Sequence, residues 1–169
     1  MIGVLASIDA PARFAANIMV APSPCHIDHD GYHGGFSLAD IHELLDTMDS
    51  NYLGLSSAMA PGIMGAPDQP ALAEELTNSF CRTDPTIARH FARVTFLSDH
   101  RAALSQSTAP TLILQCDDDL IAPRDVGDFI HIAIPGSKLV VIENTGHCPH
   151  MSAPSASVAA IRAFIAELA

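Results

Sequence analysis

The sequence lacks tryptophan, and only 5% of its residues are aromatic. Positive charge is also scarce, because 8 Lys and Arg residues stand against 19 Asp and Glu residues, for a formal net charge of -11. A surface of that sign repels phosphate backbones, so we expect no nucleic-acid partner. Charged residues or prolines interrupt the apolar runs well before the roughly 18 residues that a membrane-spanning helix needs, so we expect no membrane partner.

Cysteine is sparse and scattered. The four cysteines, Cys25, Cys81, Cys116 and Cys148, form no Cys-x-x-Cys pair. They could form two disulfides, but in an apolar chain of this length we expect reduced and mostly buried thiols. Residues 1–8 are apolar, yet no positive residue precedes them and no clear small-residue cleavage site follows, as a secretory signal requires. We therefore expect a cytoplasmic protein.

Apolar residues are plentiful. Of the 169 residues 49% are hydrophobic, and the mean hydropathy is +0.26. This composition excludes a disordered chain and permits a sizeable core. The length suggests one domain, or a piece of a larger one.

Hydrophobic spacing predicts alternating strands and helices. Short buried strands are expected at residues 15–20, 111–116 and 138–142. Helices are expected at residues 1–8, 38–52, 52–64, 70–80, 85–94, 123–134 and 158–168. Two of them begin with a recognisable cap, because Ser37 precedes Asp40 by three residues and Asp84 precedes Pro85. The pattern indicates an α/β fold with parallel strands and four helices inserted after the first strand.

Two polar residues follow neighbouring strands of this predicted sheet. Asp119 comes after the second strand, and His147 comes after the third. In α/β sheets the loops at the carboxyl ends of strands bind ligands. A carboxylate that accepts from one imidazole nitrogen leaves the other free to act as a general base. The alternative is structural, with Asp119 capping the next helix and His147 completing a turn.

Several segments together resemble the α/β-hydrolase family. Residues 112–123 resemble the strand end that bears that family's acid, and residues 146–152 resemble its histidine loop. Further segments resemble more narrowly the subfamily of the bacterial stress-response regulator RsbQ and the plant strigolactone and karrikin receptors; these are residues 22–25, 34–36, 51–52, 80–85, 87–89 and 98–101. The resemblance covers nearly the whole chain, and it implies a partial α/β-hydrolase sheet with an inserted four-helix lid.

The resemblance divides the chain into three parts. Residues 1–24 would be the end of the helix after the nucleophile and the following core strand, residues 25–107 the helical lid, and residues 108–169 the C-terminal α/β core. Asp119 would be the acid of a catalytic triad, because the family's acid stands four residues before a proline, here Pro123. His147 would be the base.

The nucleophile of such a triad is a serine in a Gly-x-Ser-x-Gly turn, and no such turn occurs in the sequence. Residues 1–7 resemble the helix just after that turn, so we expect the serine and the oxyanion-hole loop upstream of Met1. Ser7, Ser23, Cys25 and Cys148 are the candidate substitutes, but none stands at the turn. We therefore interpret the chain as the C-terminal part of a hydrolase, inactive by itself, from a late start codon or a split gene. The alternative is a genuinely short protein whose partner covers the sheet edge.

The resemblance also implies a function for the whole protein. It would hydrolyse a small hydrophobic ester or lactone-like compound, without a metal or other cofactor. The alternative is a ligand-sensing regulator, in which the lid moves and a signalling partner, such as a stress-signalling phosphatase, binds the altered surface. Phe36 and Phe96 would line the ligand pocket; the other interpretation is that they belong to the lid core.

A polar loop carries a separate signal. Three histidines, a thiol and two carboxylates lie close together in it, namely Cys25, His26, Asp28, His29, Asp30 and His33. Such groups can bind zinc, but loops of this composition are more often simply solvated. His147 with His150 could also be read as ligands, although the family resemblance explains His147 better. His42-Glu43 begins like a metalloprotease helix, yet Asp46 stands where its second histidine would be. We therefore predict no metal site.

Overall fold

The structure, a computed structural model, describes residues 1–168. Its centre is a three-stranded parallel sheet in the order β1 (Asn17–Val20), β2 (Thr111–Asp118), β3 (Lys138–Thr145). The predicted α/β class is confirmed. Both β2 and β3 continue beyond the apolar residues that predicted them, because Asp118 still pairs with Thr145 after a register shift. Among the described residues no helix is long and apolar enough to cross a membrane.

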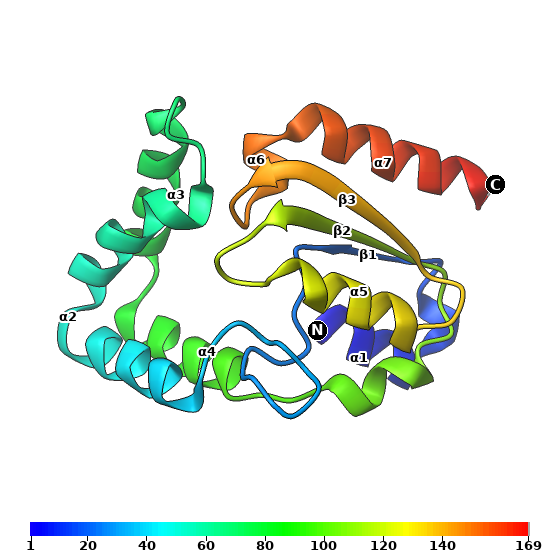
Figure 1. Ribbon diagram of the computed structural model, residues 1–169, viewed down its shortest axis with the longest axis horizontal. Helices are drawn as coiled ribbons and strands as arrows, with labels where there is room; N and C mark the ends of the chain where they lie inside the picture. The colour runs from blue at the N-terminus through cyan, green and yellow to red at the C-terminus, as the bar shows by residue number, and fades with distance from the viewer. Residues whose placement is uncertain (169) are drawn as a thin grey trace.

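Helices cover both faces of the sheet (Figure 1). On one face, α1 (Ile2–Asp9) and α5 (Arg124–Ala133) pack against the strands, and Ile113 of β2 meets Val126 and Ile130 there. On the other face, α7 (Pro154–Glu167) packs Phe164 against Leu112 and Leu114. Successive strand residues thus enter opposite cores, as the two-residue period of a strand requires. Two short helices lie in the connections between these elements: η1 (Pro11–Arg13) joins α1 to β1, and α6 (Pro149–Ser152) lies between β3 and α7.

Strand β1 lies at one edge of the sheet, with β2 as its only neighbour among residues 1–168. Ile18 and Val20 point to the face that α7 covers over β2, but over β1 they remain 39% and 36% exposed. Strand β1 therefore presents apolar, partly exposed side chains at this edge.

The chain between β1 and β2 forms a helical segment, which we define as α2 (Leu38–Met64), α3 (Pro70–Arg82) and α4 (Pro85–Phe96). It stands beyond the edge at which the strands end (Figure 1). A 3-10 helix, η2 (Arg101–Gln106), then leads back to β2. The Ser37 capping box and the Asp84 cap form as predicted. The helices predicted at residues 38–52 and 52–64 are the two halves of α2. This helix bends at Asn51, which leaves helical geometry and whose side chain accepts a hydrogen bond from the Gly54 amide.

The apolar stripe predicted for α4 does not face a core. Ile87, Phe91 and Val94 are 64%, 58% and 56% exposed. The helix instead buries Ala92 against Ile41 and Leu45 of α2. The spacing of the apolar residues correctly indicated a helix, but not the side that packs. The small Ala92 side chain packs against α2 because it lets the backbones of the two helices approach closely.

The end of α2 touches the loop that follows β3. Gly65 ends α2 with a φ of 64°, and a Cβ atom placed on it would lie 2.4 Å from the Thr145 carbonyl oxygen. Gly146 has a φ of 101°, and a Cβ atom there would lie 2.3 Å from the Met64 carbonyl oxygen. Neither position has room for a side chain. This contact fixes the helical segment to the strand ends.

We expect Gly146→Ala to lower the free energy of unfolding more than Gly136→Ala. Both glycines have a positive φ, which costs a non-glycine residue about 1–2 kcal/mol. Of these two positions, only at Gly146 would the added Cβ atom clash with backbone atoms, and such overpacking adds about 1–3 kcal/mol. Urea denaturation of the two variants measures the difference. Equal destabilisation of both would contradict the close approach of α2 to this loop.

Candidate functional site

The two predicted polar residues meet at the carboxyl edge of the sheet. Asp119 follows β2 directly, and His147 follows the end of β3 by two residues. His147 Nδ1 lies 2.9 Å from Asp119 Oδ2 and 3.2 Å from Oδ1. The Asp119 side chain has no exposed surface, whereas 27% of the His147 side chain is exposed. The pair therefore consists of a buried carboxylate and a partly accessible imidazole.

Backbone groups hold the Asp119 carboxylate in place. The amides of Ile121 and Ala122 donate to Oδ1 at 2.8 and 3.1 Å. The neighbouring carboxylates point elsewhere, because Asp117 accepts from the Asn144 amide and Asp118 accepts from the Thr145 hydroxyl. Of the three consecutive aspartates, Asp119 is the one that hydrogen-bonds to His147.

The backbone of His147 is also fixed. Its amide donates to the Ile63 carbonyl at 2.7 Å, and the Gly146 amide donates to the Asp118 carbonyl at 2.7 Å. A carboxylate at Nδ1 keeps the proton on that nitrogen, so Nε2 presents its lone pair. An imidazole in this tautomer can take a proton from a hydroxyl group and later return it.

None of the four candidate nucleophiles hydrogen-bonds to His147 within residues 1–168. The Ser7 hydroxyl is buried, donates to the Val4 carbonyl and accepts from Asn17 Nδ2. The Ser23 hydroxyl donates to the Cys25 carbonyl. Burial, aided by the charge of Asp119, raises the pKa of the Cys148 thiol. The remaining candidate, Cys25, has its Sγ 3.6 Å from Nε2 of His29.

Phe36 and Phe96 lie together, with ring centroids 6.4 Å apart in an edge arrangement. Both pack against the cluster of Ile41, Leu45 and Ala92, which is the lid-core interpretation. Neither ring lines the groove between β3 and α7 or the groove between residues 28–33 and α5. A role for these rings in ligand binding therefore stays a prediction.

His26 is a site residue that sequence reasoning missed, because it was grouped with possible metal ligands. Its ring lies 4.9 Å from that of Phe96, and its Nδ1 is 3.3 Å from the carbonyl oxygen of Ile121, in the Asp119 loop. Burial lowers the pKa of His26, and the charge of His147 acts in the same direction. His26 thus connects the aromatic pair to the Asp119 loop. The sequence carried no signal that separates His26 from the other histidines of the polar loop.

The polar loop does not gather its groups at one point. His33 pairs with Asp125 of α5, and the Asp28 carboxylate accepts from the amides of Gly34 and Gly35. Only Cys25 and His29 come together within this loop, with Sγ 3.6 Å from Nε2. The exposed His42 and His150 belong to no group of three metal-ligating side chains among the described residues.

A parallel α/β layer with a carboxylate–imidazole pair at its strand ends is also the arrangement found in α/β-hydrolases. Residues 3–161 match the alpha/beta hydrolase family, so this chain belongs to that family. A hydrolase from Oleispira antarctica has a similar structure, with a TM-score of 0.91 and 38% identity over 96% of this chain and 60% of that one.

Curated relatives place the chain near two kinds of protein. It is 36% identical to karrikin insensitive 2 receptor IA of Petunia hybrida over 94% of its length, and 32% identical to a strigolactone esterase of Arabidopsis thaliana over 92%. The chain spans 58% of the length of each of these two relatives. The resemblance stated from the sequence is therefore confirmed at the level of the family and of these receptors.

We expect Asp119→Ala to destabilise the chain more than Asp119→Asn. Alanine leaves the buried amides of Ile121 and Ala122 without an acceptor, and each such loss costs about 1–3 kcal/mol. Asparagine retains an oxygen at that position, so we expect a loss of about 1 kcal/mol or less. Urea denaturation of both variants tests this. A similar loss in both would show that the two amides do not depend on the Asp119 oxygen.

Proposed function

We propose that this chain supplies the acid and the base of a serine α/β-hydrolase acting on small hydrophobic esters or lactone-like compounds. The observation that carries the proposal is the buried Asp119 carboxylate against Nδ1 of a partly exposed His147. In this proposal residues 1–24 and 108–169 belong to the core, and residues 25–107 form the lid. The nucleophilic serine and the oxyanion hole lie in residues outside this chain, and the cytoplasm is the proposed location.

Each group has a defined task in the reaction. The serine oxygen attacks the carbonyl carbon of the ester while its proton passes to Nε2 of His147. The tetrahedral intermediate then collapses, and the departing alkoxide takes that proton from His147. Water repeats the sequence on the acyl-enzyme, and the acid is released. Asp119 orients the ring and stabilises the imidazolium. No metal or cofactor takes part.

The relatives support this substrate class without fixing it. The Petunia protein is called a receptor, and the Arabidopsis protein is called an esterase. The chain matches little more than half of each, so the activity of the whole protein is the subject of the proposal.

The reading frame upstream of the Met1 codon provides the first test. We expect it to stay open through a Gly-x-Ser-x-Gly segment. The extended protein should hydrolyse p-nitrophenyl acetate. His147→Ala should lower kcat about a million-fold, and Asp119→Asn about ten-thousand-fold, because the triad acts as a unit.

Two neighbouring residues provide matched controls. Asp118→Asn changes a carboxylate one residue away, and His150→Ala changes an exposed imidazole three residues away. Both variants should retain kcat within a few-fold. An in-frame stop codon directly upstream, or equal activity in His147→Ala and His150→Ala, would contradict the proposal.

A second candidate is a ligand-sensing regulator that acts through a protein partner. The observation that favours it is the exposed apolar stripe of Ile87, Phe91 and Val94 on α4. Contiguous exposed apolar side chains are typical of surfaces that bind other proteins. By the family resemblance, the partner would be a stress-signalling phosphatase, bound when ligand repositions the lid.

Turnover and partner binding distinguish the two candidates. If the chain belongs to a regulator, we expect slow ester turnover together with ligand-dependent binding of the phosphatase, measured by titration calorimetry. Phe91→Ser should weaken that binding at least tenfold, whereas Glu75→Ser on α3 should not. Rapid turnover of an ester, with no phosphatase bound in either state, would leave the metabolic hydrolase as the function.

A further inference from the structure

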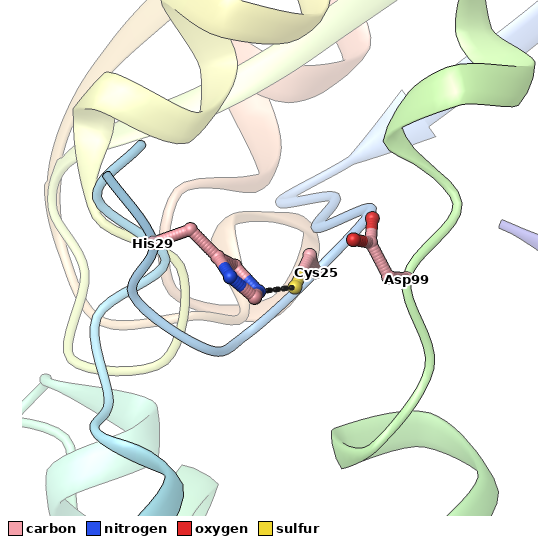
Figure 2. Close-up of side chains that lie close together, drawn as sticks. All are labelled: Cys25, His29 and Asp99. Atoms are coloured by element: carbon pink, nitrogen blue, oxygen red, sulfur yellow. Dashed lines mark hydrogen bonds between the residues drawn. The ribbon is translucent and has the colours of Figure 1, made fainter. Parts of the chain in front are cut away.

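A second cluster of reactive side chains lies outside the Asp119–His147 pair. Cys25 follows β1, His29 lies four residues further along the same loop, and Asp99 lies between α4 and η2 (Figure 2). One ligand atom from each lies within 4.8 Å of the others. Cys25 is buried, while His29 and Asp99 are exposed. The sulfur lies between the imidazole and the carboxylate (Figure 2).

The spacing of these atoms suits a tetrahedral zinc ion. With bonds of about 2.3 Å to sulfur and about 2.05 Å to nitrogen, two ligands of a tetrahedral zinc lie about 3.6 Å apart. Cys25 Sγ and His29 Nε2 are 3.6 Å apart. An oxygen ligand would stand about 3.4–3.6 Å from each of the other two atoms. The Asp99 oxygen lies within 4.8 Å of both atoms, so zinc binding would have to shorten each of these distances by about 1.4 Å at most.

The backbone of all three residues is already restrained. Cys25 and Asp99 pair in an isolated antiparallel bridge, and the His100 amide donates to the Pro24 carbonyl at 2.8 Å. His29 and Tyr32 exchange two backbone hydrogen bonds across a tight turn. The ligands therefore come from fixed positions, as a site formed in advance requires.

Arg101 and Tyr32 surround the three ligands and help to hold them in place. Arg101 donates to both oxygens of Asp99, at 2.9 Å to Oδ1 and 2.7 Å to Oδ2, and its amide also donates to Oδ1. A carboxylate has about four acceptor positions, so Oδ2 keeps one for a metal. Arg101 also stacks on Tyr32, whose hydroxyl donates to the Cys25 carbonyl. Such second-layer hydrogen bonds orient metal ligands in known sites.

The cluster does not suit a catalytic cysteine. In a Cys–His–Asp triad the imidazole stands between the thiol and the carboxylate, whereas here the thiol stands in the middle (Figure 2). Burial raises the pKa of Cys25, and the charges of Asp99 and Asp28 act in the same direction. The Ile27 hydrogen bond and the charge of Arg101 oppose this shift, and their effect is smaller than that of burial. A reactive cysteine requires positive surroundings. Carboxylates near a thiol instead favour a divalent cation.

We propose that Cys25, His29 and Asp99 bind one zinc ion, with water as the fourth ligand. When the sulfur–zinc bond forms, the thiol proton leaves to solvent. Of the three ligands, His29 also lines a groove of about 480 Å³, together with Asp28 and Tyr32. Cys25 lies on the connection that enters the helical segment, and Asp99 lies on the connection that leaves it. The ion would therefore join the two connections and restrict movement of the helical segment relative to the sheet.

Metal retention tests the proposal in the full-length protein, residues 1–169 with any residues that its reading frame adds. The protein is stripped with a chelator and then dialysed against zinc, and the bound metal is measured by mass spectrometry. We expect one zinc per chain and a higher Tm with zinc than without. His29→Gln and Asp99→Asn should each weaken zinc binding at least tenfold. Cobalt should give a thiolate-to-metal absorption band that Cys25→Ser abolishes.

Two variants control for the other thiols and imidazoles. His33→Gln removes an imidazole from the same loop, and Cys81→Ser removes an exposed thiol of the helical segment. Both should retain zinc and the cobalt band. Because His29 is exposed, His29→Gln leaves the fold intact even if Cys25→Ser does not. Zinc below one-tenth per chain, or equal retention by His29→Gln and His33→Gln, would overturn the proposal.

Discussion

The Asp119 carboxylate lies without exposed surface at the end of β2, where an unpaired charge would cost several kcal/mol. Two amides and one imidazole compensate it, and these partners determine much of the local structure. The amides belong to the turn that leads into α5, so satisfying the charge also sets the start of that helix. The imidazole belongs to the loop after β3, so the same charge joins two strand ends. One buried group thereby organises the edge at which the candidate site forms.

The helical segment depends on that edge as well. The end of α2 can approach the His147 loop only because glycine occupies both contacting positions, Gly65 and Gly146. Within the segment α3 and α4 are thinly packed, since no residue of α3 is buried and α4 buries only Ala92. Its remaining attachments are the two chain connections near Cys25 and Asp99. A metal at those connections would complement the contact at the other end of α2.

Local signals in the sequence predicted the elements well and their packing poorly. The strands and caps follow from short apolar runs and from Ser37 and Asp84, whose bonds lie within three residues. The bend at Asn51 and the exposed side of α4 depend on tertiary contacts, which spacing does not encode. The Asp119–His147 pair was predictable because both residues follow parallel strands. The pairing of Cys25 with Asp99 was not, because their bridge joins distant segments without a shared motif.

The hydrogen bond from the His147 amide to the Ile63 carbonyl also has a dynamic consequence. If the helices rotate relative to the sheet, this bond must either break or carry the imidazole with it. The position of the helices and the position of the base are then linked equilibria, and whatever shifts one shifts the other by the same free energy. A molecule bound only by helical side chains would thereby alter the alignment of His147 without touching it. One conformational equilibrium would then set both the occupancy of the helical segment and the alignment of His147.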